Sequence, residues 1–466
     1  MELKPVTQKE AALLHGYYSN CSYQLCEYAV ITKLMWKDYL CSRYAEVAGC
    51  LVMSNVHKGQ VRFEYPVPRE DGGVEQALKA IERHCMEQGI PFALTFVPAE
   101  KICSLVARYP YVRIVDTRSW QDYIYHRDDL QFFAGRRYSG QRNHINKFRS
   151  GYPEAEFRLL TAQDKGAIGA FWVEFESTYP KADDPGVKKE LALAKKMFKL
   201  IGKPYVLAGG MFDGEKLIGL SLGERCGETL IVHIEKAIYS YTGIYPTLVQ
   251  AFVDCFGGDC TWVNREDDAG EKGLRTSKLQ YGPDHLGAKY RLYMENELMN
   301  HCPEIPRLKA NRLSLDAMTK ADIPAYNRLV LNKERNVYWG YDDVAGLGEA
   351  VRDDSFFKVA QRDFESKMAV NFAIRLDGQF IGEAVLYNFD YCGGAELGCR
   401  IDPEFAGQGY GVEAFTTVAD WGLYTLQLRR VVAKCFKENK ASYKMLSACM
   451  RKKSEDETFY YFEKLV

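Results

Sequence analysis

One short pattern occurs three times along this chain at nearly equal spacing. A threonine follows an apolar residue and precedes an acidic residue by three positions at Thr7 and Glu10, Thr161 and Asp164, and Thr319 and Asp322. These residue types suit the start of a helix, because the hydroxyl and the carboxylate satisfy N–H groups that the first turn leaves unpaired. The threonines lie 154 and 158 residues apart. This spacing predicts three consecutive units, each with a strand that runs into a capped helix.

The second and third of these units also share a hairpin pattern. Residues 212–219 and 376–382 both place an Asp-Gly pair between two apolar runs. An Asp-Gly pair in this position predicts a tight turn between antiparallel strands. We therefore expect an α/β fold of three consecutive units, each a mixed central sheet flanked by helices. The expected boundaries are 1–152, 153–300 and 311–466, with the second unit paired to the first.

Composition excludes several classes of protein. The 466 residues are 47% hydrophobic and 26% charged, and the net charge is −1. Such a balance is ordinary for a globular protein and produces no overall field for nucleic acid or anionic lipid. The fourteen cysteines include no C-x-x-C pair, which argues against a disulfide framework or a metal site. Without a signal-peptide core or a long apolar run, we expect a cytoplasmic protein with no stable membrane insertion; the sequence indicates no oligomeric state.

A glycine-rich turn in the third unit combines the features of an anion-binding site. Gly407, Gly409 and Gly411 alternate between an apolar run at 395–401 and an expected helix at 412–423. Glycine lets backbone N–H groups approach an anion closely, and the helix N-terminus adds partial positive charge. The pattern favours a pyrophosphate ligand, although tight turns also use glycine for purely structural reasons.

This turn resembles the nucleotide-binding motif of the GNAT family of acetyl-CoA-dependent N-acetyltransferases, particularly the branch that acetylates ribosomal-protein N-termini and related amines. The family motif has Arg or Gln, two residues, Gly, one residue, and Gly or Ala after the fourth strand. Gly409 and Gly411 match it, whereas Ala406 stands where the family has Arg or Gln. This departure removes a side chain but no backbone donor.

The residues downstream extend the resemblance to the end of the chain. Asn439 and Ser442 match the Asn-x-x-Ser that follows the family's fifth strand, here 431–435, and 457–462 resembles its final strand. The resemblance implies an enzyme that uses acetyl-CoA and a small-molecule or peptide amine as acceptor. It implies cofactor binding by the following residues: Ile401, Gly407, Gln408, Gly409, Tyr410, Gly411, Val412 and Asn439.

The chemistry of amine acetylation narrows the choice of catalytic groups. The amine must lose a proton, and the departing thiolate gains one. All eight histidines lie at or before His301, so the third unit must use a carboxylate or water as its base. Glu396 lies near the start of the fourth strand, where relatives often have a glutamate; it is the candidate base, or else an edge-strand charge. Ser442 and Tyr443 are candidate proton donors to the thiolate, although Ser442 also suits a helix cap.

Residues 1–300 resemble the C-terminal domain of bacterial phosphatidylglycerol lysyltransferases, which consists of two fused GNAT-like folds. The best known members move an amino acid from aminoacyl-tRNA to a lipid. The resemblance rests on two dense segments, 135–148 and 264–281, and on a central strand at 233–237. It implies aminoacyl-tRNA as a partner. The candidate substrate residues are Arg142, Asn143, Lys147, Glu235, Asp267, Asp268, Arg275 and Lys278.

The residues of those segments are compatible with this function and also with simpler interpretations. Residues 135–149 contain five basic and no acidic side chains, which suits phosphate binding or a solvated helix face. The carboxylates at 266–268 suit proton transfer or a cationic aminoacyl group, but also a helix N-terminus. In the second unit, 243–247 replaces the glycine turn of 407–411, keeps only the first glycine and has Pro246, which lacks an N–H. CoA is therefore not expected there.

Two classes of function stay open at this stage. The first is an active acyltransferase that acetylates an amine in the third unit and transfers an aminoacyl group in the first two. The second is a non-catalytic ligand-binding or regulatory protein built on GNAT folds. The glycine turn and Asn439-x-x-Ser442 favour the first class, whereas Ala406 and the lack of a histidine in the third unit favour the second.

Overall fold

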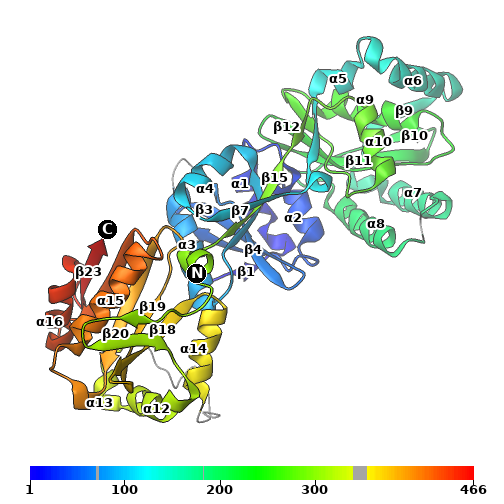
Figure 1. Ribbon diagram of the computed structural model, residues 1–466. Coiled ribbons are helices and arrows are strands. Elements are labelled where there is room, and N and C mark those ends of the chain that lie inside the picture. The colour runs from blue at the N-terminus through cyan, green and yellow to red at the C-terminus, as the bar shows by residue number, and fades with distance from the viewer. Residues whose placement is uncertain (70–72, 182, 340–353) are drawn as a thin grey trace. The chain divides into compact units, whose positions relative to one another are not determined.

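The computed structural model describes residues 1–69, 73–181, 183–339 and 354–466, which form three mixed sheets flanked by helices (Figure 1). The α/β fold class expected from the sequence is confirmed. The expected capping boxes at Thr7, Thr161 and Thr319 are all present. The described residues form two compact units: Met1–Ile81, Ala93–Ile102 and Ile114–Leu292 make the first, and Glu82–Phe92, Cys103–Arg113 and Tyr293–Val466 make the second.

The first sheet has eight strands. Its order is β1 (Lys4–Pro5), β2 (Arg43–Val47), β3 (Cys50–His57), β4 (Gln60–Glu64), β6 (Ala93–Pro98), β15 (Lys289–Met294) and β7 (Val112–Asp116), and β5 (Val67–Pro68) pairs with β3. The helices of this part of the chain are α1 (Ala11–Tyr18), α2 (Val30–Trp36), α3 (Val74–Gln88) and α4 (Ile102–Arg108).

The second sheet has seven strands. Its order is β14 (His285–Gly287), β8 (Asp122–His126), β13 (Trp262–Asn264), β12 (Thr229–Ala237), β11 (Lys216–Cys226), β10 (Leu207–Asp213) and β9 (Ala155–Leu159). The helices between 127 and 301 are α5 (Arg127–Phe132), α6 (Ser139–Gly151), α7 (Lys165–Thr178), α8 (Pro185–Met197), α9 (Ile244–Phe256), α10 (Lys272–Gln280) and α11 (Glu297–His301). The expected hairpin is confirmed as β10–β11.

The third sheet has eight strands in the order β16 (Leu308–Lys309), β17 (Leu313–Ala317), β18 (Ala369–Leu376), β19 (Gln379–Tyr387), β20 (Gly394–Ile401), β21 (Arg430–Phe436), β23 (Phe459–Leu465) and β22 (Arg451–Glu455). Its helices are α12 (Ile323–Leu331), α13 (Lys333–Asn336), α14 (Ser355–Glu365), α15 (Tyr410–Tyr424) and α16 (Lys440–Cys449). The hairpin β18–β19, the strand before the glycine turn and the helix after it are all confirmed. Buried residues of α15 such as Phe415 and Val418 share one apolar core with the sheet.

The central strands have the same arrangement in all three sheets. Two neighbouring strands run parallel over two or three residues only: β4 with β6, β12 with β13, and β20 with β21. In the third sheet, the strand beyond this pair is β23 of the same unit. In the first two sheets the corresponding strands are exchanged between the sequence repeats. β15, from residues 153–300, lies beyond β6, and β8, from residues 1–152, lies beyond β13. The sheets therefore divide residues 1–300 differently from the sequence repeats.

Candidate functional site

The glycine turn leaves a row of N–H groups without partners. Gly407 and Gly409 have φ of 80° and 83°, a region that favours glycine, and α15 begins directly after Gly409. In the described part of the chain, the N–H groups of 407–409 donate no hydrogen bond. The first N–H groups of a helix also lack internal partners. The turn therefore presents consecutive donors at a helix N-terminus, an arrangement that suits phosphate oxygens.

The same kind of helix start occurs in each of the three repeats expected from the sequence. Gly73, Gly243 and Gly409 have φ of 76°, 87° and 83° and stand immediately before α3, α9 and α15. Gly243 therefore corresponds to Gly409, whereas the sequence comparison aligned it with Gly407. That alignment was shifted by two residues because it matched the first glycine of each turn rather than the glycine that caps the helix.

The three glycines differ in the atoms that lie next to them. A Cβ on the glycine before α3 would lie 2.0 Å from the carbonyl oxygen of Ala48, and one on the glycine before α9 would lie 2.1 Å from that of His144. The nearest atom to a Cβ on Gly409 is instead Nη2 of Arg312, 3.5 Å away. Main-chain atoms therefore pack against the first two glycines, whereas a guanidinium group borders Gly409.

Arg312 was not singled out by the sequence, because it precedes β17 and lies far from the motif. Its Nη1 donates to the carbonyl oxygen of Gln408 at 3.1 Å, and its Nε donates to Glu413 at 2.8 Å. Its guanidinium also lies 4.5 Å from the ring centroid of Tyr410. Arg312 thus supplies a cation at the turn in which Ala406 replaces the Arg or Gln of the motif.

The central strands separate at Glu396. The parallel ladder between β20 and β21 ends with Glu396 opposite Val432, yet β20 continues to Ile401 and β21 to Phe436. The facing edges of the two strands have no ladder with each other beyond that point among the described residues. Backbone N–H and C=O groups there are available to a ligand.

The carboxylate of Glu396 is held at this fork by three neighbours. It accepts hydrogen bonds from the Tyr387 hydroxyl at 2.9 Å and from Nδ2 of Asn388 at 3.1 Å, and Nζ of Lys434 lies 3.7 Å away. Its side chain is 14% exposed. Burial and the charge of Glu396 together raise the pKa of Tyr387. The tyrosine therefore stays protonated and donates to the carboxylate.

The residues proposed as thiolate proton donors lie on the first turn of α16. The side chain of Asn439 caps this helix by accepting from the N–H of Ser442 at 3.0 Å. The ring of Tyr443 packs 4.8 Å from that of Tyr460. α16 borders the glycine turn, since a Cβ on Gly411 would lie 3.2 Å from the sulfur of Met445. Within the described residues, neither proposed donor bonds to Glu396.

In the first compact unit, several predicted residues meet in the loop between β13 and α10. Asp268 accepts from Nε of Arg275 at 2.8 Å and from the Tyr123 hydroxyl at 2.7 Å. Hydrogen bonds from Arg275 hold the pKa of Asp268 below its usual range. The ammonium of Lys278 donates to the carbonyl oxygens of Arg265 and Asp267. Lys278 therefore stabilises the loop from inside and is buried.

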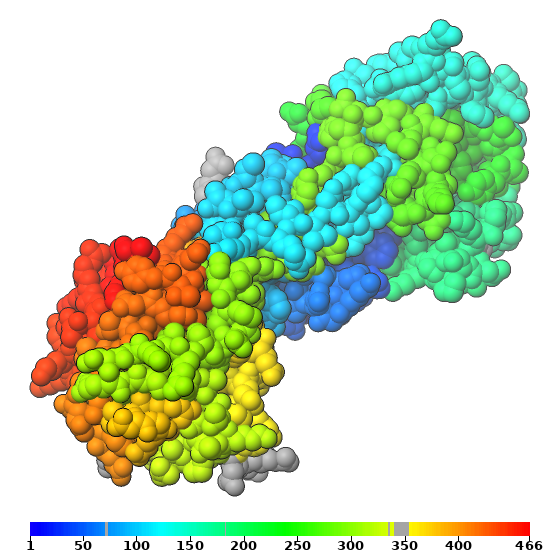
Figure 2. Space-filling model, viewed as in Figure 1, coloured from blue at the N-terminus to red at the C-terminus, as the bar shows by residue number. Residues whose placement is uncertain are grey.

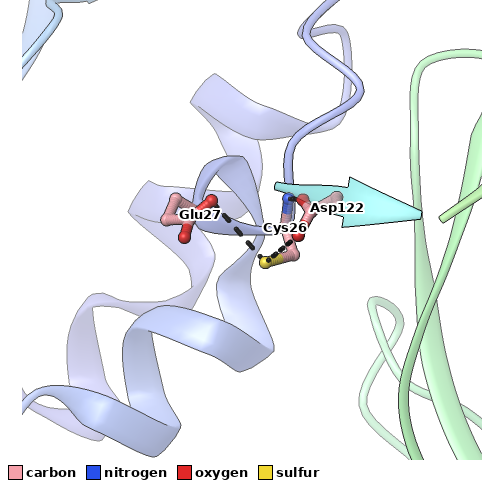
Figure 3. Close-up of side chains that lie close together, drawn as sticks. All are labelled: Cys26, Glu27 and Asp122. Carbon is pink, nitrogen blue, oxygen red and sulfur yellow. Dashed lines mark hydrogen bonds between the residues drawn. The ribbon is translucent and has the colours of Figure 1, made fainter. Parts of the chain in front are cut away.

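Three groups next to this loop approach one another as metal ligands do. Cys26, Glu27 and Asp122 converge from the segment before α2 and from β8 (Figure 3). The ammonium of Lys289 lies among them, 2.7 Å from Glu27, 2.8 Å from Asp122 and 3.4 Å from the sulfur of Cys26. Burial opposes the charge on Lys289, but Asp122 and its neighbours raise its pKa above the usual value. A buried ammonium thus serves as the cation of this cluster.

The predicted Asp267 faces this cluster. Its carboxylate lies 3.9 Å from Nζ of Lys289 and is 30% exposed, so it connects the buried charges with the surface. Burial raises the pKa of Asp267. Sequence reasoning missed Lys289 and Asp122, because an isolated charge in a strand gives no sign of its partners.

His233 was also missed as a site residue. It lies between Glu224, 3.0 Å from its Nε2, and Glu266, 2.8 Å from its Nδ1, and its side chain is 1% exposed. Burial opposes its charge, but these carboxylates raise the pKa of His233 to about 9. Glu266 has φ of 57°, a strained value for a non-glycine residue that occurs most often at functional sites.

The remaining predicted residues lie apart from the loop's carboxylates. Both carboxylate oxygens of Glu235 accept from Nη2 of Arg265 at 3.1 Å. Arg142 on α6 donates to the carbonyl oxygens of Phe133 and Gly135 at 2.5 and 2.6 Å. Exposed Asn143 and Lys147 lie on the same helix. The structure thus brings Asp267, Asp268, Arg275 and Lys278 together and leaves the α6 residues on another element.

Comparison with known proteins identifies both parts of the chain. The family model described as phosphatidylglycerol lysyltransferase, C-terminal, matches residues 24–293, more than half of the chain. The chain belongs to this family. A second model, described as acetyltransferase (GNAT) domain, matches residues 312–449 of this lysyltransferase-family protein. The two matches cover separate parts of the chain.

Individual relatives are distant. An uncharacterised protein of Mycoplasmoides gallisepticum is 24% identical over 175 residues, which cover 36% of this chain and 54% of that protein. The lysyltransferase-family protein thus spans about half the length of this curated relative. A conserved protein of unknown function from Bacteroides thetaiotaomicron has 24% identity and a TM-score of 0.58, and covers 63% of this chain and 100% of its own. This likeness shows a shared fold.

A structure of Mycobacterium smegmatis RimJ in complex with CoA-disulfide covers 34% of this chain and 86% of its own, with 18% identity and a TM-score of 0.29.

In the lysyltransferase-family protein itself, none of the helices within the described ranges is long and apolar enough for a membrane crossing.

Proposed function

We propose that the C-terminal domain transfers the acetyl group of acetyl-CoA to the amine of a small molecule or peptide. The observation that carries this proposal is the glycine turn at 407–409, whose N–H groups donate no hydrogen bond in the described part of the chain. A Cβ on its Gly409 would also meet no main-chain atom within 4 Å. Its unpaired N–H groups and the neighbouring Arg312 suit the charge of a pyrophosphate. The fork beyond Glu396 leads from this turn into the sheet.

The residues of the fork have the chemistry that amine acetylation needs. When bound, acetyl-CoA supplies an activated thioester carbonyl. Glu396 accepts a proton from the acceptor's ammonium, which makes the amine nucleophilic. N–H groups on the unpaired edge of β20 hydrogen-bond the oxygen that gains negative charge. Ser442 or Tyr443 donates the proton that the departing thiolate takes up.

Binding at the glycine turn is tested by calorimetric titration with CoA. Gly409→Asp places a carboxylate beside the phosphates and is expected to lower CoA affinity by about 10²-fold, since two like charges near a protein surface repel by a few kcal/mol. Gly409→Asn is the matched control, because asparagine has nearly the same shape, tolerates positive φ and carries no charge. Equal affinity in the two variants would remove the pyrophosphate from this turn.

Turnover is tested separately from binding. Release of free thiol from acetyl-CoA is measured over a panel of primary amines and peptide N-termini. Amine-dependent thiol release is expected from the wild-type protein. Binding of acetyl-CoA without release over the whole panel would favour the non-catalytic alternative.

The loop after β13 favours a second activity in the N-terminal part, namely transfer of an aminoacyl group from aminoacyl-tRNA. The supporting observation is the half-buried Asp267 at the mouth of a charge cluster, within the segment that the lysyltransferase family model matches. Its carboxylate is positioned to hold the ammonium of an aminoacyl group or to accept its proton. Asp268 and Arg275 orient the loop.

Transfer is measured as movement of radiolabelled amino acid from charged tRNA to a lipid or a soluble amine. Asp267→Asn is expected to lower the rate by about 10² or more, the usual worth of a general base. Asp284→Asn is the matched control, because Asp284 is an exposed aspartate paired with His285. A normal rate in Asp267→Asn would leave this carboxylate with a structural role only.

A further inference from the structure

A face of α8 concentrates positive charge in the first compact unit. Residues 185–203 contain six lysines and one acidic residue. The apolar side of α8, with Leu191, Ala194 and Met197, is buried. α8 lies at the surface of the unit (Figures 1 and 2). Exposed lysines lie on the opposite side of the helix and in the turn that follows it. We name the exposed members the α8 lysine face: Lys188, Lys189, Lys196, Lys199 and Lys203.

Most of this charge is not neutralised by the protein. Lys196, Lys199 and Lys203 form no ion pair within the described ranges. Lys188 pairs with Asp183 at 3.1 Å, but both side chains are exposed, and such pairs contribute little. Lys189 lies 3.9 Å over the ring of Tyr39. The face is therefore ready to bind an anionic partner.

Two ion pairs connect the chain around α8 with the loop that carries Asp267 and with the neighbouring strand β12. Lys181, just before α8, pairs with Glu271 of this loop at 2.9 Å. Glu190 of α8 pairs with Lys236, the neighbour of Glu235 on β12, at 3.0 Å. A partner that lies along the α8 lysine face would therefore have one end next to the loop.

The chemistry of the face favours a nucleic acid over a lipid surface. A helix that binds a bilayer presents apolar side chains to the acyl chains, whereas the apolar residues of α8 point into the protein. α8 runs for 13 residues, roughly 20 Å at helical rise. Several consecutive phosphates of a duplex fit within that length.

We propose that the α8 lysine face binds the phosphate backbone of tRNA and directs its aminoacylated 3′ end to the loop at 265–271. This inference rests on the proposed aminoacyl transfer and names the surface that holds its donor. It differs from the expectation that the basic residues of α6 contact phosphate, since Arg142 there already binds two carbonyl oxygens.

The test measures binding of deacylated tRNA to the full chain by fluorescence anisotropy over a range of KCl concentrations. The variant Lys196→Gln, Lys199→Gln, Lys203→Gln is expected to lose about tenfold or more in affinity at low salt. The slope of log K against log salt should fall by about 3, one for each lost phosphate contact. The matched control neutralises three basic residues of α6 and of the turn just before it with Arg136→Gln, Lys147→Gln and Arg149→Gln, and should bind nearly as wild type.

Three other outcomes would overturn the inference. Unchanged affinity and slope in the α8 variant would remove this face from the contact, and a loss in the α6 variant alone would move the contact to α6. Wild-type protein that binds phosphatidylglycerol vesicles but no tRNA would assign the face to a membrane. Aminoacyl transfer is scored in its own assay, so tRNA binding through α8 without transfer would sustain the inference while the proposed activity fails.

Discussion

The proposed base is the residue whose role is tested most directly. Glu396 lies where β20 and β21 separate, and its carboxylate is fixed by Tyr387, Asn388 and Lys434. Glu396→Gln keeps the size of the side chain and one accepting oxygen but cannot take up the proton of an ammonium. We expect kcat to fall by roughly 10²–10⁴ while the dissociation constant of acetyl-CoA stays within about twofold.

Tyr387→Phe is the matched control for this substitution. It removes one hydrogen bond to Glu396 and leaves the carboxylate in place, so we expect a much smaller loss of kcat. A near-normal rate for Glu396→Gln would mean that the acceptor loses its proton to solvent and that the glutamate is structural.

His233 couples the stability of the N-terminal part to pH. Its pKa is raised to about 9 by Glu224 and Glu266, against about 6.5 in an unfolded chain. A raised pKa means that the folded protein binds the proton more tightly. This contribution is therefore complete below pH 6.5 and is lost as the pH rises towards 9.

We expect the free energy of unfolding of wild type to exceed that of His233→Gln by at most about 3 kcal/mol at pH 6, with the difference shrinking up to pH 9. Urea titrations at five or six pH values measure this difference. A difference that is constant across the range would show that His233 is not charged in the folded state.

At this scale, the sequence predicted residues that share a segment and missed those that meet only in the fold. Asp268, Arg275 and Lys278 lie within one dense stretch and were found together. Lys289 and Glu27 are 262 positions apart, and each looks like an ordinary surface charge in its own strand or turn. Only the sheet brings them into contact.

Helix starts were the elements that the sequence predicted best, because a capping box is decided by residues three positions apart. Asp164 completes the capping box of the 3-10 turn (Ala162–Asp164) that leads into α7, and it makes no ion pair within the described part of the chain. Asp322 occupies the same position before α12 and also accepts from Nη1 and Nη2 of Arg375 at 2.8 Å. The two boxes therefore differ by one buried guanidinium contact.

Thr161→Ala and Thr319→Ala are expected to cost similar amounts, about 1 kcal/mol each, because both remove only the cap. Asp322→Asn should cost more than Asp164→Asn by about 1–2 kcal/mol, because it weakens a charge-assisted pair as well. Denaturant unfolding of the four variants measures these differences. Equal losses in the two aspartate variants would show that Arg375 contributes nothing to stability.

Strands and turns were predicted with their approximate bounds, but the sequence did not show which other segments pack against them. The sequence predicted a glycine turn before α15 and the loss of that turn before α9, where Pro246 gave the reason to exclude CoA from the second unit. The structure also places the carbonyl oxygen of His144, on α6, next to Gly243 at the start of α9. No local pattern predicts that one helix covers the N-terminus of another, since this depends on packing between distant segments.

At the scale of the molecule, the repeat predicted three units but not the exchange of strands between the first two. A strand's own residues decide that it is extended, whereas its neighbours depend on the path of the chain. β15 lies between β6 and β7, and β8 lies between β13 and β14. Each of the first two sheets therefore depends on a strand from the other sequence unit.

Because of this exchange, we expect residues 1–152 and 153–300 to fold only together. A fragment of residues 1–152 lacks β15 and leaves β6 and β7 without the strand between them, and a fragment of residues 153–300 lacks β8 in the same way. Because unpaired backbone groups in a sheet interior are costly, we expect neither fragment to melt cooperatively when expressed alone. Expressed together, the two fragments should co-purify and regain a single thermal transition by circular dichroism, as should an intact fragment of residues 1–300. A cooperative transition in residues 1–152 alone would show that β15 is dispensable to the first sheet and that the exchange does not bind the two units into one.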